Sequence, residues 1–520
     1  MTQRDRSQET GRTSAGTALM LAGTLVVCFS GWSLIADLSG QRQLTTRTTI
    51  ALRYVAPTVV ATLLFASRRL KPSAQLRILI SGISFTLSLY AVELFLTLFS
   101  TPQTSAFSAL DGQSQAQLQP VMTRLAASRN KAQFAADLTR RFGHPIDIRS
   151  PAEVLDDLHK GGIDVIPIVT PSNNLFISQP DGTIRSSIAL DGREVMPLAS
   201  VSDRATLLCN ENGDWIRYRS DSRGFNNPDD VWRSGRVDIA ALGDSFTHGF
   251  CVPGNENFVD LIRQRDHATL NLGMAGNGPL LMLATLTEYL PSFTPKIVLW
   301  FYYEGNDLVD LQTERRSALL KNYMRADFSQ PGLARQGDID RAILAELPRL
   351  AAIAADNARQ QPRNSLVYEL TAFTKLTSLR NRLMPFVETD PKAIEAASDF
   401  ERANMEVFQE IMRQAKGRVG AWNGHLYFVY LPEWTRYTSY SSWGKAKRGD
   451  VLDLVRRLGI PIIDIDPIFR MHGEPLSLFP FGGVGHYTAV GHHLVADEVV
   501  RRLQQDASPD EHAIDPRLFK

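Results

Sequence analysis

The sequence predicts an α/β fold that follows a group of membrane-spanning helices. From about residue 236 to the end, short apolar strand candidates alternate with helical stretches, which is typical of a parallel sheet with helices on both faces. Three apolar segments occur in the first hundred residues, and a region rich in turn residues and short β-type runs follows them. The expected organisation is three transmembrane helices (about 17–38, 48–66 and 78–99), a linker (100–119), a small accessory α+β segment (120–235) and an α/β domain (236–520) with a helical insertion (about 308–390).

Composition limits the classes of partner. The chain has 520 residues, of which 44% are apolar, so it can hold more than one domain and a large core. Its formal net charge of +1 gives no general attraction for nucleic acid or another polyanion. We therefore expect no nucleic-acid partner.

The apolar segments are each close to the roughly 20 residues that a helix needs to cross a bilayer. The first has no convincing cleavage site for a signal peptide and is read as retained. Arg53 lies inside the second, at a cost of roughly 3 kcal/mol at a helix centre, but it is near one end and can reach the headgroups. Basic residues precede the first segment and crowd the connection between the second and third: Arg4, Arg6, Arg12; Arg68, Arg69, Lys71, Arg77. Because such residues stay on the cytoplasmic side, three spans predict a multi-pass protein of the cytoplasmic membrane with its α/β domain on the periplasmic or extracellular side.

Strands and helices of the α/β domain follow from apolar runs and helical spacing. The predicted strands are 237–242, 268–272, 296–302, 425–431 and 460–465, and the helices are 257–265, 280–289, 449–458 and 488–505. Helical spacing also occurs in the insertion and before the fourth strand, at 339–359, 365–383 and 391–416. In the accessory segment we expect helices at 120–142 and 151–160 and a strand at 164–169.

A candidate nucleophile follows the first of these strands. The stretch GDSFTHG, residues 243–249, places Ser245 directly after an apolar run, at the edge of an open α/β sheet where ligands bind. A serine hydroxyl is unreactive at neutral pH, so it needs a base to take its proton and donors to hold the developing oxyanion.

Three later blocks offer these groups in chain order. NLGMAGNGP (271–279) supplies glycines after the second strand, EGND (304–307) an asparagine after the third, and GHYTAVGHH (485–493) a histidine before the last helix. With these four blocks the chain resembles the SGNH (GDSL-type) hydrolase family. The resemblance implies Ser245 as nucleophile, His486 as general base, and an oxyanion hole made by the Ser245 N–H, the Gly276 N–H and the Asn306 amide. It also implies a three-layer, flavodoxin-like sheet with strand order 2-1-3-4-5.

The chain departs from the family at one position. The family usually carries an aspartate three residues before the histidine, and here that residue is Gly483. Loss of the carboxylate from a Ser-His-Asp triad can cost on the order of 10⁴ in turnover. Asp466, Glu474 and a backbone carbonyl are the candidate substitutes, and the working hypothesis is a Ser-His dyad.

The positions of the cysteines favour an exported catalytic domain. Cys209 and Cys251 are the two that follow the predicted membrane segments, and one lies near the nucleophile loop, so a disulfide is expected in an oxidising compartment. Two unpaired buried thiols are the alternative.

The other histidines and glycines do not indicate a metal or a cofactor. His492 and His493 lie on a helix without a zinc-binding spacing and are expected to pack or to lie on the helix surface. His248 is expected to support the nucleophile by a hydrogen bond, with a role as substitute base as the lesser alternative. The glycines around Gly276 lack the GxGxxG spacing of a dinucleotide site.

Together these features predict a membrane-anchored serine esterase or acyl (acetyl) transferase that acts on O-acyl groups of a cell-envelope glycan or a lipid-linked substrate. The alternative is a non-catalytic binding or assembly protein of envelope polysaccharide biosynthesis that keeps the fold, because Gly483 replaces the usual acid.

Overall fold

The computed structural model describes residues 15–28, 55–99, 131–265, 268–360, 391–438 and 448–506. The predicted linker 100–119 and the predicted helix 365–383 lie outside them. The chain divides into two compact units, Met1–Ser114 with Ser365–Asp399, and Gln115–Asn364 with Phe400–Lys520.

The first unit contains three apolar helical segments. Ala15–Cys28 is a short apolar helix, α3 spans Ala56–Ala66, and α4 spans Pro72–Phe99. Within the described residues, only Pro72–Leu94 is long and apolar enough to cross a membrane. The structure thus gives the third predicted span as a helix of sufficient length, whereas the predicted spans 17–38 and 48–66 are described only in part.

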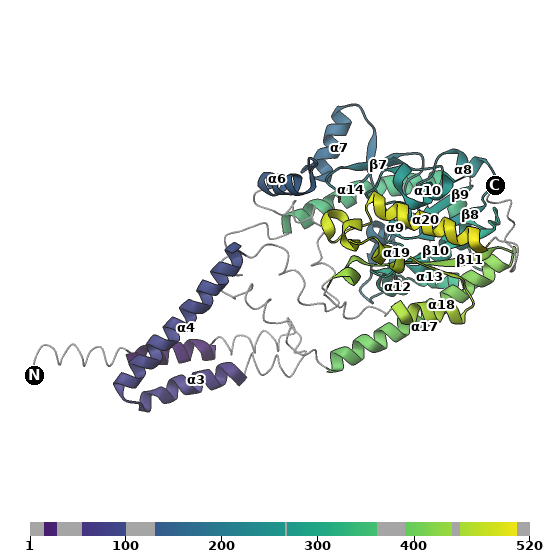
Figure 1. Ribbon diagram of the computed structural model, residues 1–520. Helices are drawn as coiled ribbons and strands as arrows, with labels where there is room; N and C mark the ends of the chain where they lie inside the picture. The colour runs from purple at the N-terminus through teal and green to yellow at the C-terminus, as the bar shows by residue number, and fades with distance from the viewer. Residues whose placement is uncertain are drawn as a thin grey trace, which may run out of the picture. The chain divides into compact units, whose positions relative to one another are not determined.

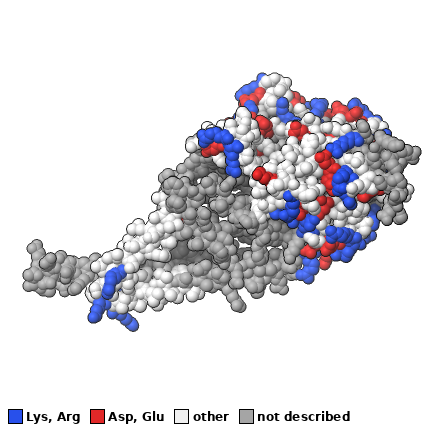
Figure 2. Space-filling view, in the orientation of Figure 1, with Lys and Arg blue, Asp and Glu red and all other residues white. Residues whose placement is uncertain are grey.

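The helices of this unit expose apolar side chains to their surroundings. Only 6% of the apolar window of α4 is buried, although its mean hydropathy is 1.4. In Figure 2 the described surface of this unit is nearly uncharged, and basic side chains gather at one end. The short connection between α3 and α4 carries Arg68, Arg69 and Lys71.

A five-stranded parallel sheet is the centre of the second unit (Figure 1). Its strands are β8 (Ile239–Gly243), β9 (Thr269–Gly273), β10 (Ile297–Tyr303), β11 (His425–Leu431) and β12 (Ile462–Asp464). They lie in the order β9-β8-β10-β11-β12, and each pair is parallel, which confirms the 2-1-3-4-5 order. Every residue of β8, β9 and β10 is buried, as expected for a parallel sheet covered on both faces.

Helices cover both faces of this sheet. Alternate residues of β10 point to opposite layers: Phe301 stacks on Phe258 at the start of α10 (Phe258–Arg263), and Tyr302 contacts Phe408 of α17 (Pro391–Gly420). The C-terminal helix α20 (Ala489–Asp506) packs beside α10 and crosses the strands in Figure 1. Other helices in the described part of this region include α11 (Pro279–Tyr289), α12 (Asp307–Glu314), α13 (Ala318–Lys321), α14 (Gln336–Gln360), α18 (Arg448–Arg457) and α19 (Asp466–Met471).

The accessory segment is built from small elements. Helices α6 (Lys131–Phe142) and α7 (Pro151–Lys160) precede a three-stranded sheet of β1 (Val165–Pro167), β6 (Ala205–Cys209) and β7 (Ile216–Arg219). Two hairpins lie between β1 and β6, and they are formed by β2 (Phe176–Ser178) with β3 (Ile184–Ser186) and by β4 (Ala189–Leu190) with β5 (Arg193–Glu194). A single helical turn, η4 (Pro171–Leu175), comes before β2, and α8 (Asp230–Arg233) leads into β8.

This segment shares its core with the α/β domain. Leu175 and Phe225 of the accessory segment are fully buried in the same apolar cluster as Leu270 and Leu286. Phe225 packs edge-on against Tyr289 at the end of α11, with ring centroids 5.2 Å apart. The accessory segment is therefore held as one body with the sheet that carries Ser245.

Candidate active site

The nucleophile candidate lies on a tight turn between β8 and α9 (Ser245–His248). The carboxylate of Asp244 accepts the Phe246 N–H at 2.9 Å and so caps this short helix. Glycines at the ends of β8 and β9 let the turn approach the sheet, because a Cβ on Gly243 or Gly273 would overlap with the first turn of α9. Ser245 is thereby fixed at the carboxyl edge of the sheet with 8% of its surface exposed.

The predicted base meets this serine. His486 Nε2 lies 2.7 Å from Ser245 Oγ, a hydrogen bond that joins residues 241 positions apart. Aromatic rings hold the imidazole in place: Phe246 and Phe250 have ring centroids 4.7 and 5.0 Å from it. The structure therefore brings Ser245 and His486 together as the sequence predicted.

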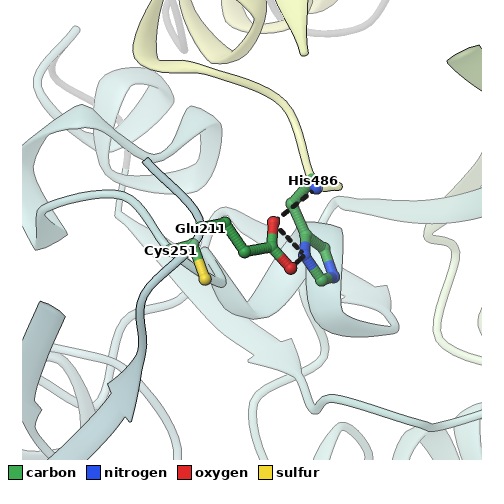
Figure 3. A group of neighbouring side chains, drawn as sticks. All are labelled: Glu211, Cys251 and His486. Atoms are coloured by element: carbon green, nitrogen blue, oxygen red, sulfur yellow. Dashed lines mark hydrogen bonds and ion pairs between the residues drawn. The ribbon is translucent and has the colours of Figure 1, made fainter. Parts of the chain in front are cut away.

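The other side of the imidazole faces a carboxylate that the sequence did not reveal. Glu211 lies in the β6–β7 connection of the accessory segment, and its Oε1 and Oε2 are 2.9 and 3.0 Å from His486 Nδ1 (Figure 3). Its Oε2 also accepts the backbone N–H of His486 at 2.7 Å. The side chains of His486 and Glu211 are only 17% and 11% exposed, so this pair is largely shielded from water. Ser245, His486 and Glu211 form a connected Ser-His-Glu series.

Glycine is needed next to the base for this contact. Gly485 has a φ of 154°, and a Cβ there would come within 2.9 Å of Glu211 Oε2 and 2.8 Å of Pro480 Cγ. The absence of a side chain at 485 therefore leaves the space that Glu211 occupies.

The substitutes considered from sequence do not take this role. Asp466 accepts a hydrogen bond from the Tyr437 hydroxyl and forms ion pairs with Arg448 and Arg470. Glu474 is exposed, and the carboxylate that contacts His486 Nδ1 is that of Glu211. The hypothesis of a Ser-His dyad is wrong, because the imidazole has a carboxylate partner, Glu211, which lies 275 residues earlier in the chain.

The surroundings of His486 favour its charged form. Burial lowers its pKa, but the charge of Glu211, the hydrogen bond that the imidazole donates to Glu211 and the charge of Asp244 outweigh burial, so the pKa of His486 is raised above its ordinary value. Burial also raises the pKa of Asp244, to about 6. The imidazolium that forms when His486 takes the serine proton is therefore stabilised.

The predicted oxyanion donors follow three neighbouring strands at the same edge. Ser245 comes after β8, Gly276 after β9 and Asn306 after β10. In the turns and loops of the described chain, the N–H groups of Ser245 and Gly276 donate to no backbone carbonyl. Asn306 begins α12, and its side-chain oxygen is buried without a hydrogen-bond partner among the described residues.

Buried carboxylates fix the loops that carry these donors. Glu314 accepts the N–H groups of Gly278 and Leu280 at 2.6 and 2.8 Å, and this holds the loop that contains Gly276. Burial raises the pKa of Glu314 to about 7. Glu304, before Asn306, is paired with Arg436, and this helps to hold the loop that carries Asn306.

Cys209 and Cys251 form a disulfide, which confirms the predicted pair. It joins the end of β6 to the loop after α9, and Glu211 lies two residues beyond Cys209. The donor atoms of Glu211, Cys251 and His486 lie within 4.8 Å of one another (Figure 3). The sulfur of Cys251 is in the disulfide, so it is not available as a thiolate ligand for a metal ion.

Neither His248 nor His492 is a candidate base. His248 is fully buried, its ring meets Tyr218 edge-on at 5.2 Å, and burial lowers its pKa to about 3. Its two ring nitrogens have no hydrogen-bond partner among the described residues, so the expected supporting hydrogen bond is not found there. His492 stacks on Phe258 and accepts its N–H at 3.1 Å, which confirms the predicted packing role.

Comparisons with known proteins give structural likeness only. No family model matches the chain, and no curated protein matches it. The chain is similar to a protein from Desulfitobacterium hafniense described as lipolytic and of the G-D-S-L family, with 10% identity, a TM-score of 0.26, and coverage of 51% of this chain and 99% of the other. A lipase/acylhydrolase from Enterococcus faecalis matches with 13% identity and a TM-score of 0.27, over 53% of this chain and 100% of that one. An α/β hydrolase, LAE5, from the metagenome of Lake Arreo matches with 12% identity and a TM-score of 0.27, over 51% of this chain and 94% of that one. TM-scores this low carry no argument about chemistry, which has to come from the geometry of the site itself.

Proposed function

We propose that the chain is a serine ester hydrolase or acyl transferase that works through Ser245, His486 and Glu211. The observation that carries the proposal is the unbroken series of contacts, 2.7 Å from Ser245 Oγ to His486 Nε2 and 2.9 Å from His486 Nδ1 to Glu211 Oε1. Because a nucleophile, a base and an orienting carboxylate stand in hydrogen-bond contact, they can perform acyl transfer without a cofactor.

The reaction has two steps. His486 Nε2 takes the Ser245 proton while Oγ bonds to the ester carbonyl carbon, and the resulting imidazolium then gives that proton to the departing alcohol. This leaves an acyl group on Ser245. In the second step water, or the hydroxyl of an acceptor, gives its proton to His486 and attacks the acyl carbon. The bond from Oγ to the acyl carbon breaks, the imidazolium returns the proton to Oγ, and the acid or a new ester is released.

The oxyanion of both steps requires hydrogen-bond donors. We assign this role to the N–H groups of Ser245 and Gly276 and to the side-chain amide of Asn306, which follow three adjacent strands. In a site of this kind, removal of one donor costs about 3 to 4 kcal/mol in the barrier.

A catalytic role explains the site better than a binding role. The alternative of a binding module arose from Gly483, which leaves the histidine without its usual acid. Glu211 supplies a carboxylate to the same nitrogen of the imidazole. A binding module gains nothing from a shielded carboxylate that raises the pKa of a histidine beside a serine hydroxyl.

We further propose that the first unit anchors the protein in the cytoplasmic membrane and that the catalytic unit lies on the periplasmic or extracellular side. The exposed apolar side chains of α3 and α4, and the basic residues that connect these helices, support an anchor. The disulfide supports an oxidising compartment. O-acyl groups of a cell-envelope glycan or of a lipid-linked glycan are then the substrates to test first, with acetyl transfer included. A reporter that is active only in the cytoplasm, fused after Lys520, should be inactive, and an active reporter would contradict this orientation.

Turnover of p-nitrophenyl acetate by the purified full-length protein tests the chemistry. Ser245→Ala and His486→Ala should each reduce kcat to the background rate while the thermal unfolding temperature stays close to that of the unmodified protein. Equal rates in the unmodified protein and both variants would support the binding module instead.

A further inference from the structure

A part of the accessory segment lies directly against the proposed oxyanion loop. The turn η4 (Pro171–Leu175) contacts Gly276, which has a φ of 81°. A Cβ built on Gly276 would lie 2.5 Å from Asn173 Nδ2 and would overlap with Ser172 Oγ. The space on this side of Gly276 is thus already filled by Ser172 and Asn173.

This turn is fixed in place. Asn174 Oδ1 accepts the Thr170 N–H at 2.7 Å, and Asn173 Nδ2 donates to Thr170 Oγ1 at 3.0 Å. Val169 before the turn and Leu175 at its end are both buried in the main core. Because both ends are anchored and the side chains brace the turn, a substrate cannot displace it without breaking these contacts.

The chemistry of the proposed reaction determines which part of the substrate meets this turn. The oxyanion must lie about 3 Å from its donors, so the carbonyl carbon lies about 4 Å from the Gly276 nitrogen. The departing alcohol must face His486, which protonates it. The acyl chain takes the remaining direction, away from the imidazole. Ser172 and Asn173 lie against Gly276, one of the proposed oxyanion donors.

We propose that Ser172 and Asn173 form the wall of the acyl subsite and restrict the enzyme to short acyl groups of acetyl size. This inference rests on the proposed function. Ser172 Oγ is buried and has no hydrogen-bond partner among the described residues, so the wall offers a hydroxyl toward Gly276. Asn173 is exposed, and its Nδ2 lies on the same side of Gly276 as Ser172 Oγ. Specificity for the acyl chain is thereby assigned to the accessory segment, which also supplies Glu211.

A chain-length series of p-nitrophenyl esters tests this wall, because the leaving group stays constant while the acyl group grows from acetate to butyrate to octanoate. The full-length protein should prefer acetate to octanoate in kcat/KM by at least tenfold. In the double variant S172A/N173A, the octanoate-to-acetate ratio should rise at least tenfold, and Asn173→Ala alone should shift it in the same direction. Ser187→Ala is the matched control, since its hydroxyl is also buried without a described partner and belongs to the same segment; its ratio should stay within twofold.

Two outcomes separate this proposal from the proposed function. Ester turnover that depends on Ser245, with an unchanged chain-length ratio in the double variant or an equal shift in Ser187→Ala, overturns the wall alone. No ester turnover above that of Ser245→Ala overturns the proposed function and the wall together.

Discussion

Replacement of Glu211 by glutamine is the sharpest perturbation of the site, because it removes one negative charge and keeps the shape of the side chain. The carboxylate makes three contacts with His486, two to Nδ1 at 2.9 and 3.0 Å and one to the backbone N–H at 2.7 Å. A hydrogen bond to a charged group contributes about 1.5 to 3 kcal/mol, and each 1.36 kcal/mol in the barrier is a factor of ten in rate. Loss of the charge-assisted bond to the imidazolium should therefore reduce kcat by about 10- to 200-fold. A glutamine NH₂ that faces Nδ1 would favour the wrong tautomer and enlarge the loss toward 10⁴.

The pH dependence has a defined sign. Glu211 raises the pKa of His486, and His486 must be neutral to act as a base. In the unmodified protein, kcat/KM should therefore fall as the pH drops through this raised pKa. Without the Glu211 charge, the pKa of His486 decreases, so the acidic limb of the profile should move to lower pH while the plateau rate decreases. The pair also adds to folding stability below the unfolded pKa of histidine, and this contribution is lost as the pH rises through the folded pKa.

The assay is p-nitrophenyl acetate turnover by full-length protein between pH 5 and 9, with thermal unfolding as a check on the fold. Glu474→Gln is the matched control, since Glu474 is the other glutamate considered from sequence, and its rate and profile should not change. An unchanged rate and an unchanged acidic limb in Glu211→Gln would refute a role of this carboxylate in catalysis.

Three further predictions concern the groups around this series. Gly485→Ala should reduce kcat at least tenfold and lower the unfolding temperature, because a φ of 154° is unfavourable for alanine and its Cβ would come within 2.9 Å of Glu211 Oε2; full activity would show that the contact is dispensable. Cys209→Ser opens a disulfide with a sequence separation of 42, which by loop entropy stabilises the fold by about 4 kcal/mol, so both the unfolding temperature and turnover should decrease. If the Cys209→Ser variant retains full turnover, Glu211 keeps its position without the disulfide, and this prediction is wrong. His248→Phe should retain activity and alter stability by less than about 1 kcal/mol, since the ring is buried, neutral and without a described polar partner; loss of turnover at full stability would restore His248 as a functional group.

Much of the fold was predictable because buried parallel strands appear in the sequence as short apolar runs that end at turn-forming residues. The runs that became β8 and β10 are apolar throughout, and β11 is apolar after His425. Each is followed within two residues by aspartate, glycine or proline, which favour a turn. Strand ends in an α/β sheet meet at one edge, so Ser245 and Asn306 could be placed together from local sequence alone.

The third member of the series could not be found in this way. Glu211 lies in a connection of the accessory segment, 275 residues before the histidine that it contacts, and no local spacing records such a contact. One indirect signal exists: the predicted Cys209–Cys251 bridge brings residue 211 close to the loop after the nucleophile. The same limit applies to Ser172, whose contact with Gly276 depends on how the accessory segment packs onto the domain.

The central claim is that Ser245 is an activated nucleophile. Treatment of the full-length protein with a serine-directed fluorophosphonate, followed by peptide mass spectrometry, tests it most directly. We expect a single adduct on Ser245, formed much more slowly in His486→Ala and in Glu211→Gln. An absent adduct, or one that forms on Ser245 at the same rate in all three proteins, would contradict activation by His486 and Glu211.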